Sequence, residues 1–280
     1  MTKLLIHPIT DKKLEAFTNK PSHALILVGP TGSGKLSLAK KIAETVLEIP
    51  TIAKYPYGLF IEPTNNNISI EVIRQIEHFL SLKVPGANTY KRAIIIEQAE
   101  KLSIEAQNAL LKNLEEPPSD TIFILTVSHT DRLLPTLRSR SQTILINQPD
   151  IKAVREMLSN IDSADFNRAY SMSGGRPGLL NAILNNIDHP LKQASECAKQ
   201  LLSGTTYDRL LLVDKLARNP ELAGNVTSIL QHMAHVSLQN AKGSNFKRWQ
   251  SILNASYKAS EALANNGQPK LVLTSLMMNL

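Results

Sequence analysis

Short apolar runs alternate with amphipathic segments through the first half of the chain. Residues 23–28 read HALILV, and two further apolar runs lie at residues 93–96 and 121–127. The segments LSLAKKIAETVLEI and IEAQNALLKNLEE carry apolar residues at spacings of three and four, the helical period, and Pro117 and Pro118 end the second segment. Fully apolar strands separated by helices predict an α/β core, a parallel sheet with helices on both faces.

The pattern changes after Ile146. The segment NQPD is typical of a linker, and Asp150 is a candidate helix N-cap. From there to the C-terminus the sequence is helical, with breaks at SGGRPG, DHP and NNGQP. We therefore expect three domains: a core at residues 1–147, a small helical domain at 148–187 and a second helical domain at 188–280.

The composition is that of a globular protein, with 42% hydrophobic and 20% charged residues among 280. The formal net charge of +7 is compatible with a polyanionic partner such as DNA, which charge alone does not establish. The single cysteine, Cys197, excludes an internal disulfide framework and a cysteine-rich zinc module, so we expect no zinc. The N-terminus lacks a signal peptide's apolar stretch, and no run approaches the about 18 apolar residues of a membrane span, which predicts a cytoplasmic protein.

A glycine-rich segment, GPTGSGK, stands between a predicted strand and a predicted helix and matches the phosphate-binding pattern G-x-x-x-x-G-K. Glycines let backbone N–H groups converge on phosphate oxygens, the helix N-terminus adds positive potential, and the lysine reaches the terminal phosphates. The candidate nucleotide-binding residues are Gly29, Pro30, Thr31, Gly32, Ser33, Gly34, Lys35 and the adjoining Leu36. We expect ATP as the ligand; the alternative is a glycine turn that holds none.

Two positions depart from what ATP hydrolysis requires. The residue after the loop lysine is ordinarily Ser or Thr, whose hydroxyl coordinates magnesium, but here it is Leu36. An active enzyme of this type ends its next core strand with Asp-Glu, whereas the run 93–96 ends in Glu97 and Gln98. Glu97 keeps a carboxylate, but Gln98 cannot act as a base. The sequence predicts poor magnesium coordination and little or no hydrolysis, unless EQAEKL is only an exposed helix start.

Several segments, in order, resemble one family. They are HA at 23–24, GPTGSGK, IIIEQAEKLS, ALLKNLEEPPSDTIFIL, LLPTLRSRS and the C-terminal PKLVLTSLMMNL. Together they resemble the delta-prime subunits of bacterial DNA polymerase III clamp loaders, which are AAA+ proteins. The resemblance covers essentially the whole chain and is weakest in the last third. It implies that the core is an AAA+ domain, that residues 148–187 form its lid and that residues 188–280 form an oligomerising collar.

The resemblance also implies a function: helping to load the sliding clamp onto primed DNA during replication. The implied partners are motor (gamma/tau) and delta subunits, the clamp and primer–template DNA. Motor subunits carry a zinc-binding cysteine cluster, which a chain with a single cysteine cannot form. Delta-prime members often carry the cluster too, so its absence is a departure for either assignment. Leu36, Glu97 and Gln98 favour delta-prime. The delta subunits of clamp loaders normally lack both the glycine-rich phosphate loop and a Ser-Arg motif. This chain carries both, in GPTGSGK and at Ser139 and Arg140, so delta is the less favoured assignment.

Two arginines match motifs of the family. Arg140, in SRS, aligns with the arginine that enters the nucleotide site of a neighbouring subunit and stabilises charge there, so it is the candidate arginine finger acting in trans. Arg176, in GGRPG, resembles the lid arginine that contacts the phosphates of the subunit's own nucleotide. The alternatives are a surface arginine for Arg140 and a glycine-stabilised turn between helices for Arg176.

Residues 67–74 resemble the family's helix that faces DNA. Ser69 is its candidate cap, and free N–H groups together with Arg74 would bind a phosphate without reading sequence. A solvated helix face is the alternative.

Two other functions remain open from the sequence. The chain could be an active ATPase, either a clamp-loader motor or an AAA+ remodeller, or a small-molecule P-loop kinase. A kinase would leave the helical last third unexplained.

Overall fold

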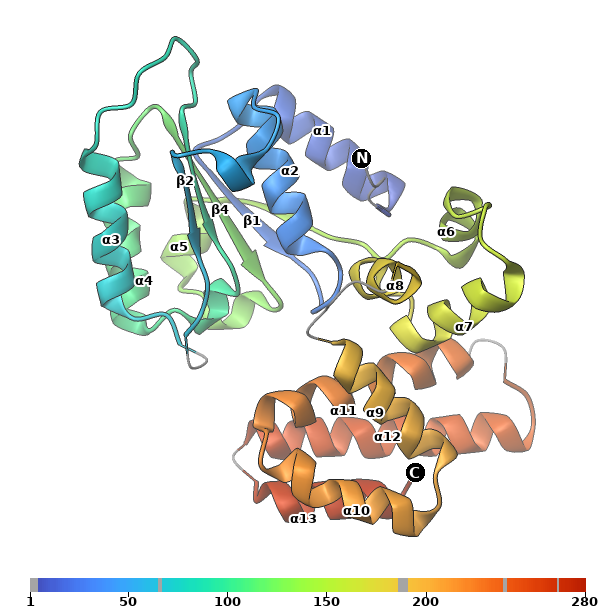
Figure 1. Cartoon of the computed structure of the whole chain (residues 1–280). Helices are drawn as coiled ribbons and strands as arrows, with labels where there is room; N and C mark the ends of the chain where they lie inside the picture. Colours follow the sequence, from blue (N-terminus) through green and yellow to red (C-terminus); the bar gives the residue numbers. More distant parts are fainter. Residues whose placement is uncertain (1–4, 65–66, 186–190, 239–240, 266) are drawn as a thin grey trace. The chain divides into compact units, whose positions relative to one another are not determined.

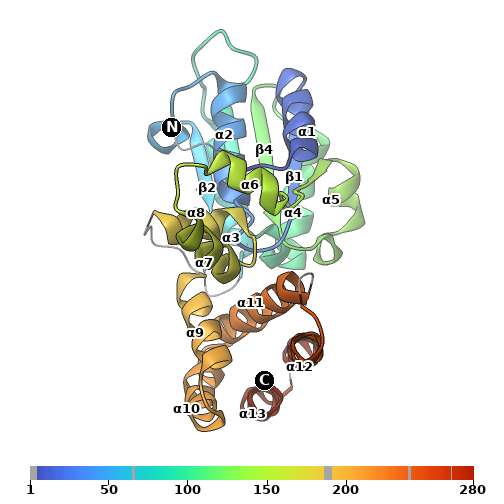
Figure 2. The ribbon, with the colours of Figure 1, turned by 90° about the vertical axis from the view of Figure 1, so that its right-hand side faces the viewer.

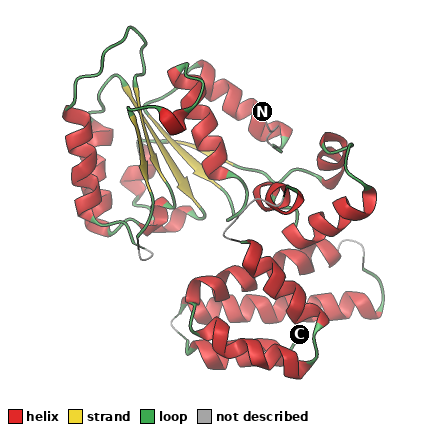
Figure 3. Cartoon of the chain, viewed as in Figure 1, coloured by secondary structure: helices red, strands yellow, loops and turns green. Residues whose placement is uncertain are grey.

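The computed structural model describes residues 5–64, 67–185, 191–238, 241–265 and 267–280 (Figure 1). These residues divide into two compact units, 1–149 and 150–280. All strands of the described chain lie in the first unit, and the second is helical (Figure 3).

Within the described residues, five parallel strands form one sheet in the order β2-β3-β4-β1-β5. The strands are β1 (Ala24–Val28), β2 (Gly58–Ile61), β3 (Arg92–Ile96), β4 (Thr121–Val127) and β5 (Gln142–Leu145). In the centre, Ile26 of β1 lies opposite Leu125 of β4. The three interior strands are almost wholly buried, which confirms the parallel sheet predicted from their apolar runs.

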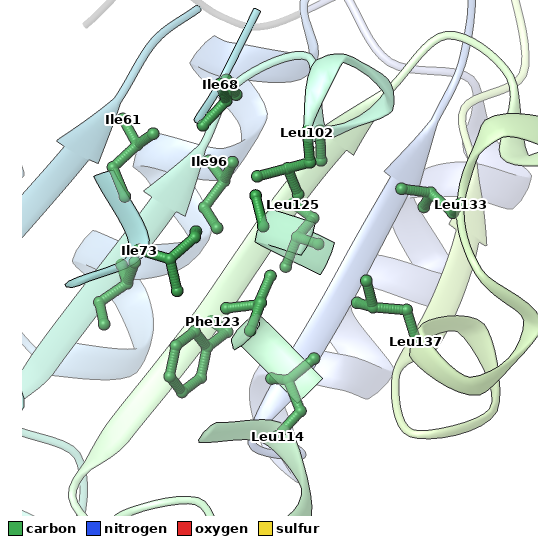
Figure 4. Close-up of a cluster of buried hydrophobic side chains, with 14 of the residues drawn as sticks. Ile61, Ile68, Ile73, Ile96, Leu102, Leu114, Phe123, Leu125, Leu133 and Leu137 are labelled. Carbon is green, nitrogen blue, oxygen red and sulfur yellow. The ribbon is translucent and has the colours of Figure 1, made fainter. Parts of the chain in front are cut away.

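Alternate residues of the interior strands face opposite layers of helices. One face, with Ile94 and Phe123, packs against α3, α4 and α5 (Figure 4). The other face, with Leu25 and Ile95, packs against α1 and α2. Figures 1 and 2 show this arrangement of helices around the sheet. The helices are α1 (Pro8–Asn19), α2 (Lys35–Leu47), α3 (Ile70–Ser81), α4 (Ile104–Glu115) and α5 (Pro135–Ser139).

The helix predicted from IEAQNALLKNLEE is confirmed as α4. The Ser103 hydroxyl accepts a hydrogen bond from the backbone N–H of Ala106 (3.1 Å) and caps the helix, which ends at Glu115, just before the two prolines.

Two strands and two helices of the first unit escaped prediction, the helices being α1 and the five-residue α5. The edge strands β2 (GLFI) and β5 (QTIL) have four residues each and only partly buried faces; β2 has an apolar run of only three residues, and β5 has none of that length. Helix α1 begins at Pro8 and is anchored by Thr10, whose buried hydroxyl accepts a hydrogen bond from the backbone N–H of Asn147 (3.0 Å).

The second unit contains helices around a separate apolar core. Asp150 is the N-cap residue of its first helix, as predicted. The division predicted near residues 187–188 stays a prediction, since both lie outside the described residues. The described helices are α6 (Ile151–Met157), α7 (Ser163–Ser173), α8 (Pro177–Leu184), α9 (Lys192–Ser203), α10 (Thr206–Ala217), α11 (Pro220–Leu238), α12 (Ser244–Ala264) and α13 (Pro269–Met278). None of the helices in the described ranges is long and apolar enough to span a bilayer.

Candidate functional site

The nucleotide-binding residues predicted in the first unit follow the carboxyl ends of neighbouring strands of the sheet, whereas Arg176 lies in the second unit. The glycine-rich loop follows β1, Glu97 and Gln98 follow β3, and Ser128 follows β4. Val28 at the end of β1 lies opposite Val127 at the end of β4. Because the strands are parallel, their carboxyl ends lie together, which is where open α/β sheets bind ligands.

The loop has the backbone that a phosphate cradle needs. Gly32 and Gly34 have φ angles of +84° and +86°, a region that side chains disfavour, and Gly34 is the N-cap residue of α2. At Gly29 a Cβ atom would lie 3.2 Å from the Cβ of Ile146. Backbone conformation therefore favours glycine at two positions, and close packing favours it at a third.

Lys35 is turned into its own loop. Its Nζ donates hydrogen bonds to the carbonyl oxygens of Gly29 (2.6 Å) and Pro30 (3.0 Å), and the residue is buried. The buried Ser33 hydroxyl has no hydrogen-bond partner among the described residues. A glycine-rich loop at a helix N-terminus, a lysine and this hydroxyl fit a phosphate, provided that the lysine exchanges carbonyl oxygens for phosphate oxygens.

The two positions expected to coordinate magnesium, Leu36 and Glu97, suit a metal ion less well than the loop suits a phosphate. Leu36 packs against the apolar core beside α2 and offers no oxygen. Burial, followed by the nearby Glu62 carboxylate, raises the pKa of Glu97, while Lys40 and Lys35 oppose the shift. Magnesium prefers ionised oxygen ligands, and at nucleotide sites it takes one or two of them from the protein. The raised pKa of the Glu97 carboxyl and the missing hydroxyl at Leu36 both weaken the protein's share of such a site.

Gln98 has a strained backbone. Its φ angle is +51°, in the left-handed region that a non-glycine residue rarely adopts, and its N–H donates to the Thr126 hydroxyl (3.1 Å). The hydrogen bond to Thr126 holds the turn after β3 in this conformation, but the Gln98 side chain is an amide and offers no basic carboxylate.

Sequence reasoning missed two residues beside the loop. The Ser128 hydroxyl lies 3.4 Å from that of Thr31, and the Ser128 backbone N–H donates to the Glu100 carboxylate (3.0 Å). Ser128 could have been found from the sequence, because it is the polar residue directly after the apolar run 121–127. Nothing local marks Glu100, because its partner is 28 residues away.

Arg140 lies at the opposite end of the sheet from the loop. It caps α5 and precedes Gln142, which pairs with Leu25 near the start of β1. The loop follows the other end of β1, a strand of five residues that spans about 16 Å at about 3.3 Å per residue. Arg140 therefore lies about one strand length from its own loop.

The guanidinium of Arg140 is held within its own unit. Its Nη2 lies 2.8 Å from Oε1 of Glu115, and its Nη1 donates to the Thr136 carbonyl oxygen at 3.4 Å. Both side chains of the ion pair are partly exposed, at 37% and 48%. The arginine is thus oriented yet accessible.

Arg176 is buried inside the second unit. It is the N-cap residue of α8, only 1% exposed, and its Nη2 donates to the hydroxyl and the carbonyl oxygen of Ser228 (2.9 and 3.2 Å) on α11. Burial lowers the pKa of Arg176 to about 10, so the guanidinium is still charged at neutral pH. Its Nε and Nη1 have no hydrogen-bond partner in the described ranges. The predicted phosphate contact stays a prediction, and it requires this group to leave Ser228.

Ser69 is the N-cap residue of α3, but its side chain makes no capping bond to the helix backbone. It instead lowers the pKa of the Glu71 carboxyl by hydrogen bonding. Arg74 is exposed one turn further along. The predicted DNA contact stays a prediction, and Glu71 places a negative charge where a phosphate would approach the helix end.

A family model described as "DNA polymerase III, delta subunit" matches residues 9–150. DNA polymerase III subunit delta' of Pseudomonas aeruginosa is 28% identical over 180 residues, which cover 56% of this chain and 54% of the relative. DNA polymerase III subunit tau of Bacillus subtilis is 32% identical over 219 residues, covering 72% of this chain and 36% of the relative. The chain thus spans about half or less of the length of these relatives.

Among solved structures, a DNA polymerase III gamma subunit-related protein of Thermotoga maritima has a TM-score of 0.56 at 21% identity, covering 95% of this chain and 97% of that one. At this identity the likeness establishes the fold alone, a parallel sheet covered by helices and followed by further helices.

Proposed function

Because the chain belongs to the DNA polymerase III delta-prime family of clamp-loader proteins, we propose that it serves as a delta-prime-like subunit of a sliding-clamp loader. In this role it assembles with motor (gamma/tau) and delta subunits and helps to place the sliding clamp on primed DNA. Residues 148–187 act as the lid and residues 188–280 as the collar of the assembly.

The subunit itself hydrolyses little or no ATP. Phosphoryl transfer depends on charge neutralisation and on a positioned attacking water. Leu36 supplies no ligand for magnesium, burial disfavours the ionised form of Glu97, and Gln98 supplies no base. The loop and Lys35 would still hold the phosphates of a bound nucleotide, with Arg176 as a further contact after it leaves Ser228.

The observation that carries the proposal is the position of Arg140. The arginine is accessible and lies at the amino end of the strands, whereas the chain's own loop lies at their carboxyl end. A guanidinium placed in this way cannot serve its own site, but it can enter the nucleotide site of a neighbour. Arg140 is therefore the trans-acting finger. The end of α3, with Ser69 and Arg74, is the surface proposed to face DNA.

A second candidate is an active motor-type ATPase, which the 32% identity to the tau subunit favours. The two candidates differ in where hydrolysis occurs. A motor hydrolyses ATP with its own loop, whereas a delta-prime-like subunit stimulates hydrolysis by its neighbour.

The test is the steady-state ATPase of a complex reconstituted with motor and delta subunits, in the presence of clamp and primed DNA. Arg140→Ala should lower the rate while assembly, followed by gel filtration, is retained. The loss at the one dependent site can reach about 10³–10⁵-fold, and the loss in total rate is smaller when other sites keep their own fingers. Arg138→Ala is the matched control, since Arg138 is an exposed arginine two residues earlier.

An unchanged rate for an assembled Arg140→Ala complex would reject the trans role. Rapid hydrolysis by the isolated chain, abolished by Lys35→Ala, would instead establish the motor-type function.

A further inference from the structure

Glu115 and Arg140 meet although 25 positions separate them in the sequence. Glu115 is the last residue of α4, and Arg140 directly follows α5. Their charged groups are 2.8 Å apart, within hydrogen-bonding distance. Neither the finger motif nor the helix pattern indicates this contact.

The packing beneath the ion pair fixes its geometry. Leu114, next to Glu115, and Leu137, in α5, are both buried in the same apolar cluster under the sheet (Figure 4). Pro117 and Pro118 prevent α4 from continuing past the acid. The backbone positions of the acid and of the arginine are therefore set by the core and do not depend on the ion pair itself.

The ion pair contributes little to stability. A partly exposed pair of this kind is worth only about 0–1 kcal/mol. That net value already includes the rotamer entropy lost by both side chains, and an interaction of about 1 kcal/mol still favours the paired orientation of the arginine about fivefold. The C-terminal end of α4 also carries partial negative charge, which favours a cation at this place.

The contacts leave the guanidinium able to bind a second group. Glu115 and the Thr136 carbonyl oxygen engage Nη2 and Nη1 through one contact each among the described residues. A guanidinium has five N–H donors, so donors remain for phosphate oxygens.

We propose that Glu115 is the positioning residue of Arg140: its carboxylate holds the guanidinium in the direction from which it enters the neighbouring subunit's nucleotide site. This inference rests on the proposed trans role of Arg140. Glu115 itself touches neither nucleotide nor DNA and acts only through the arginine.

The test uses the reconstituted complex with five variants of this chain: Glu115→Ala, Glu115→Asp, Arg140→Ala, the Glu115→Ala/Arg140→Ala double variant and Glu116→Ala. Glu116 is the matched control, because it is the adjacent exposed glutamate at the same helix end. For each complex, assembly, kcat and the KM for ATP are measured with clamp and primed DNA.

Glu115→Ala should lower kcat at the dependent site by about two- to fivefold, the rate equivalent of an interaction of up to about 1 kcal/mol, with assembly and KM unchanged. Glu115→Asp should recover part of the loss, since it keeps the carboxylate. The double variant should match Arg140→Ala alone, and Glu116→Ala should match the wild type. This lack of additivity is a readout that a merely structural role would not produce.

Three results would overturn the inference. A wild-type or raised rate in Glu115→Ala, alongside a loss in Arg140→Ala, removes the positioning role and leaves the trans finger standing. A further loss in the double variant shows that Glu115 acts elsewhere. No loss in Arg140→Ala removes both the finger and its positioning residue.

Discussion

Arg92 and Asp120 form an ion pair at the start of two neighbouring strands, with Nη2 of Arg92 at 2.8 and 3.0 Å from the two carboxylate oxygens of Asp120. Nη1 of the same arginine donates to the carbonyl oxygens of Phe79, Leu80 and Leu82 at the end of α3. Arg92 is 6% exposed. One side chain thus satisfies the terminal carbonyls of a helix and joins that helix to β3 and β4.

Asp120→Asn should lower the free energy of unfolding of the first unit by about 3 kcal/mol, because it leaves a buried guanidinium without its counter-charge. Arg92→Met should cost at least as much, since it also leaves three carbonyl oxygens unpaired. The measurement is urea denaturation followed by circular dichroism. Asp131→Asn, at an exposed acid, is the control. Losses below about 0.5 kcal/mol, the usual range of surface substitutions, would show that the pair is dispensable.

The isolated chain should turn over ATP negligibly yet retain some nucleotide binding. The glycine loop and Lys35 are in place, whereas Leu36 and Gln98 lack the groups that hydrolysis uses. Lys35→Ala should weaken binding of a fluorescent nucleotide, because it removes the cation of the loop. Lys41→Ala, an exposed lysine of α2, should leave binding as it is. Identical titrations for Lys35→Ala and the wild type would contradict a role of this lysine in binding.

The second unit should lose stability in mild acid because of His232. Burial, and then the charges of Arg176 and His235, lower the pKa of His232 from 6.5 to about 4. Between these values the unfolded chain binds a proton that the folded chain does not, so stability is complete above about pH 6.5 and declines as the pH falls towards 4. The loss attributable to this group is up to about 3 kcal/mol, from about 1.36 kcal/mol per pH unit.

Chemical denaturation at pH 7 and pH 4.5 checks the role of His232. His232→Gln should reduce the difference between the two pH values, whereas His78→Gln, at an exposed histidine of the first unit, should leave it as in the wild type. An equal difference in all three proteins would assign the acid sensitivity to other groups.

Exposed apolar side chains on α10 and α13 should carry the proposed collar contacts. Leu211 and Leu271 are 62% and 66% exposed, and an ion pair between Asp214 and Lys270 (2.8 Å) links the two helices. Leu211→Asp combined with Leu271→Asp should leave the isolated chain folded but prevent its co-elution with motor and delta subunits, because charge at an apolar interface is costly. Tyr257→Asp on α12 is the comparison. Disruption by the α12 substitution alone would place the interface on that helix.

Local sequence determined the interior of the sheet but not its edges. The runs 24–28, 93–96 and 121–127 are apolar because those strands are buried on both faces, and this signal needs no partner to be read. Both edge strands have only four residues, and β5 (QTIL) begins with two polar ones, so a segment such as β5 gives no pattern of its own. Only pairing with a neighbouring strand makes it a strand.

The candidate site also has features that the local sequence predicts and features that only the tertiary structure shows. The sequence alone determined the glycine loop, Lys35 and the departures at Leu36 and Gln98. The residue types within a short segment set both its backbone conformation and the ligand groups that it offers. Tertiary structure decided that Glu115 meets Arg140 and that Arg176 lies against Ser228, 52 residues further along. These contacts join residues distant in the chain, and they exist because packed helices and strands bring them together after the local pattern has been satisfied.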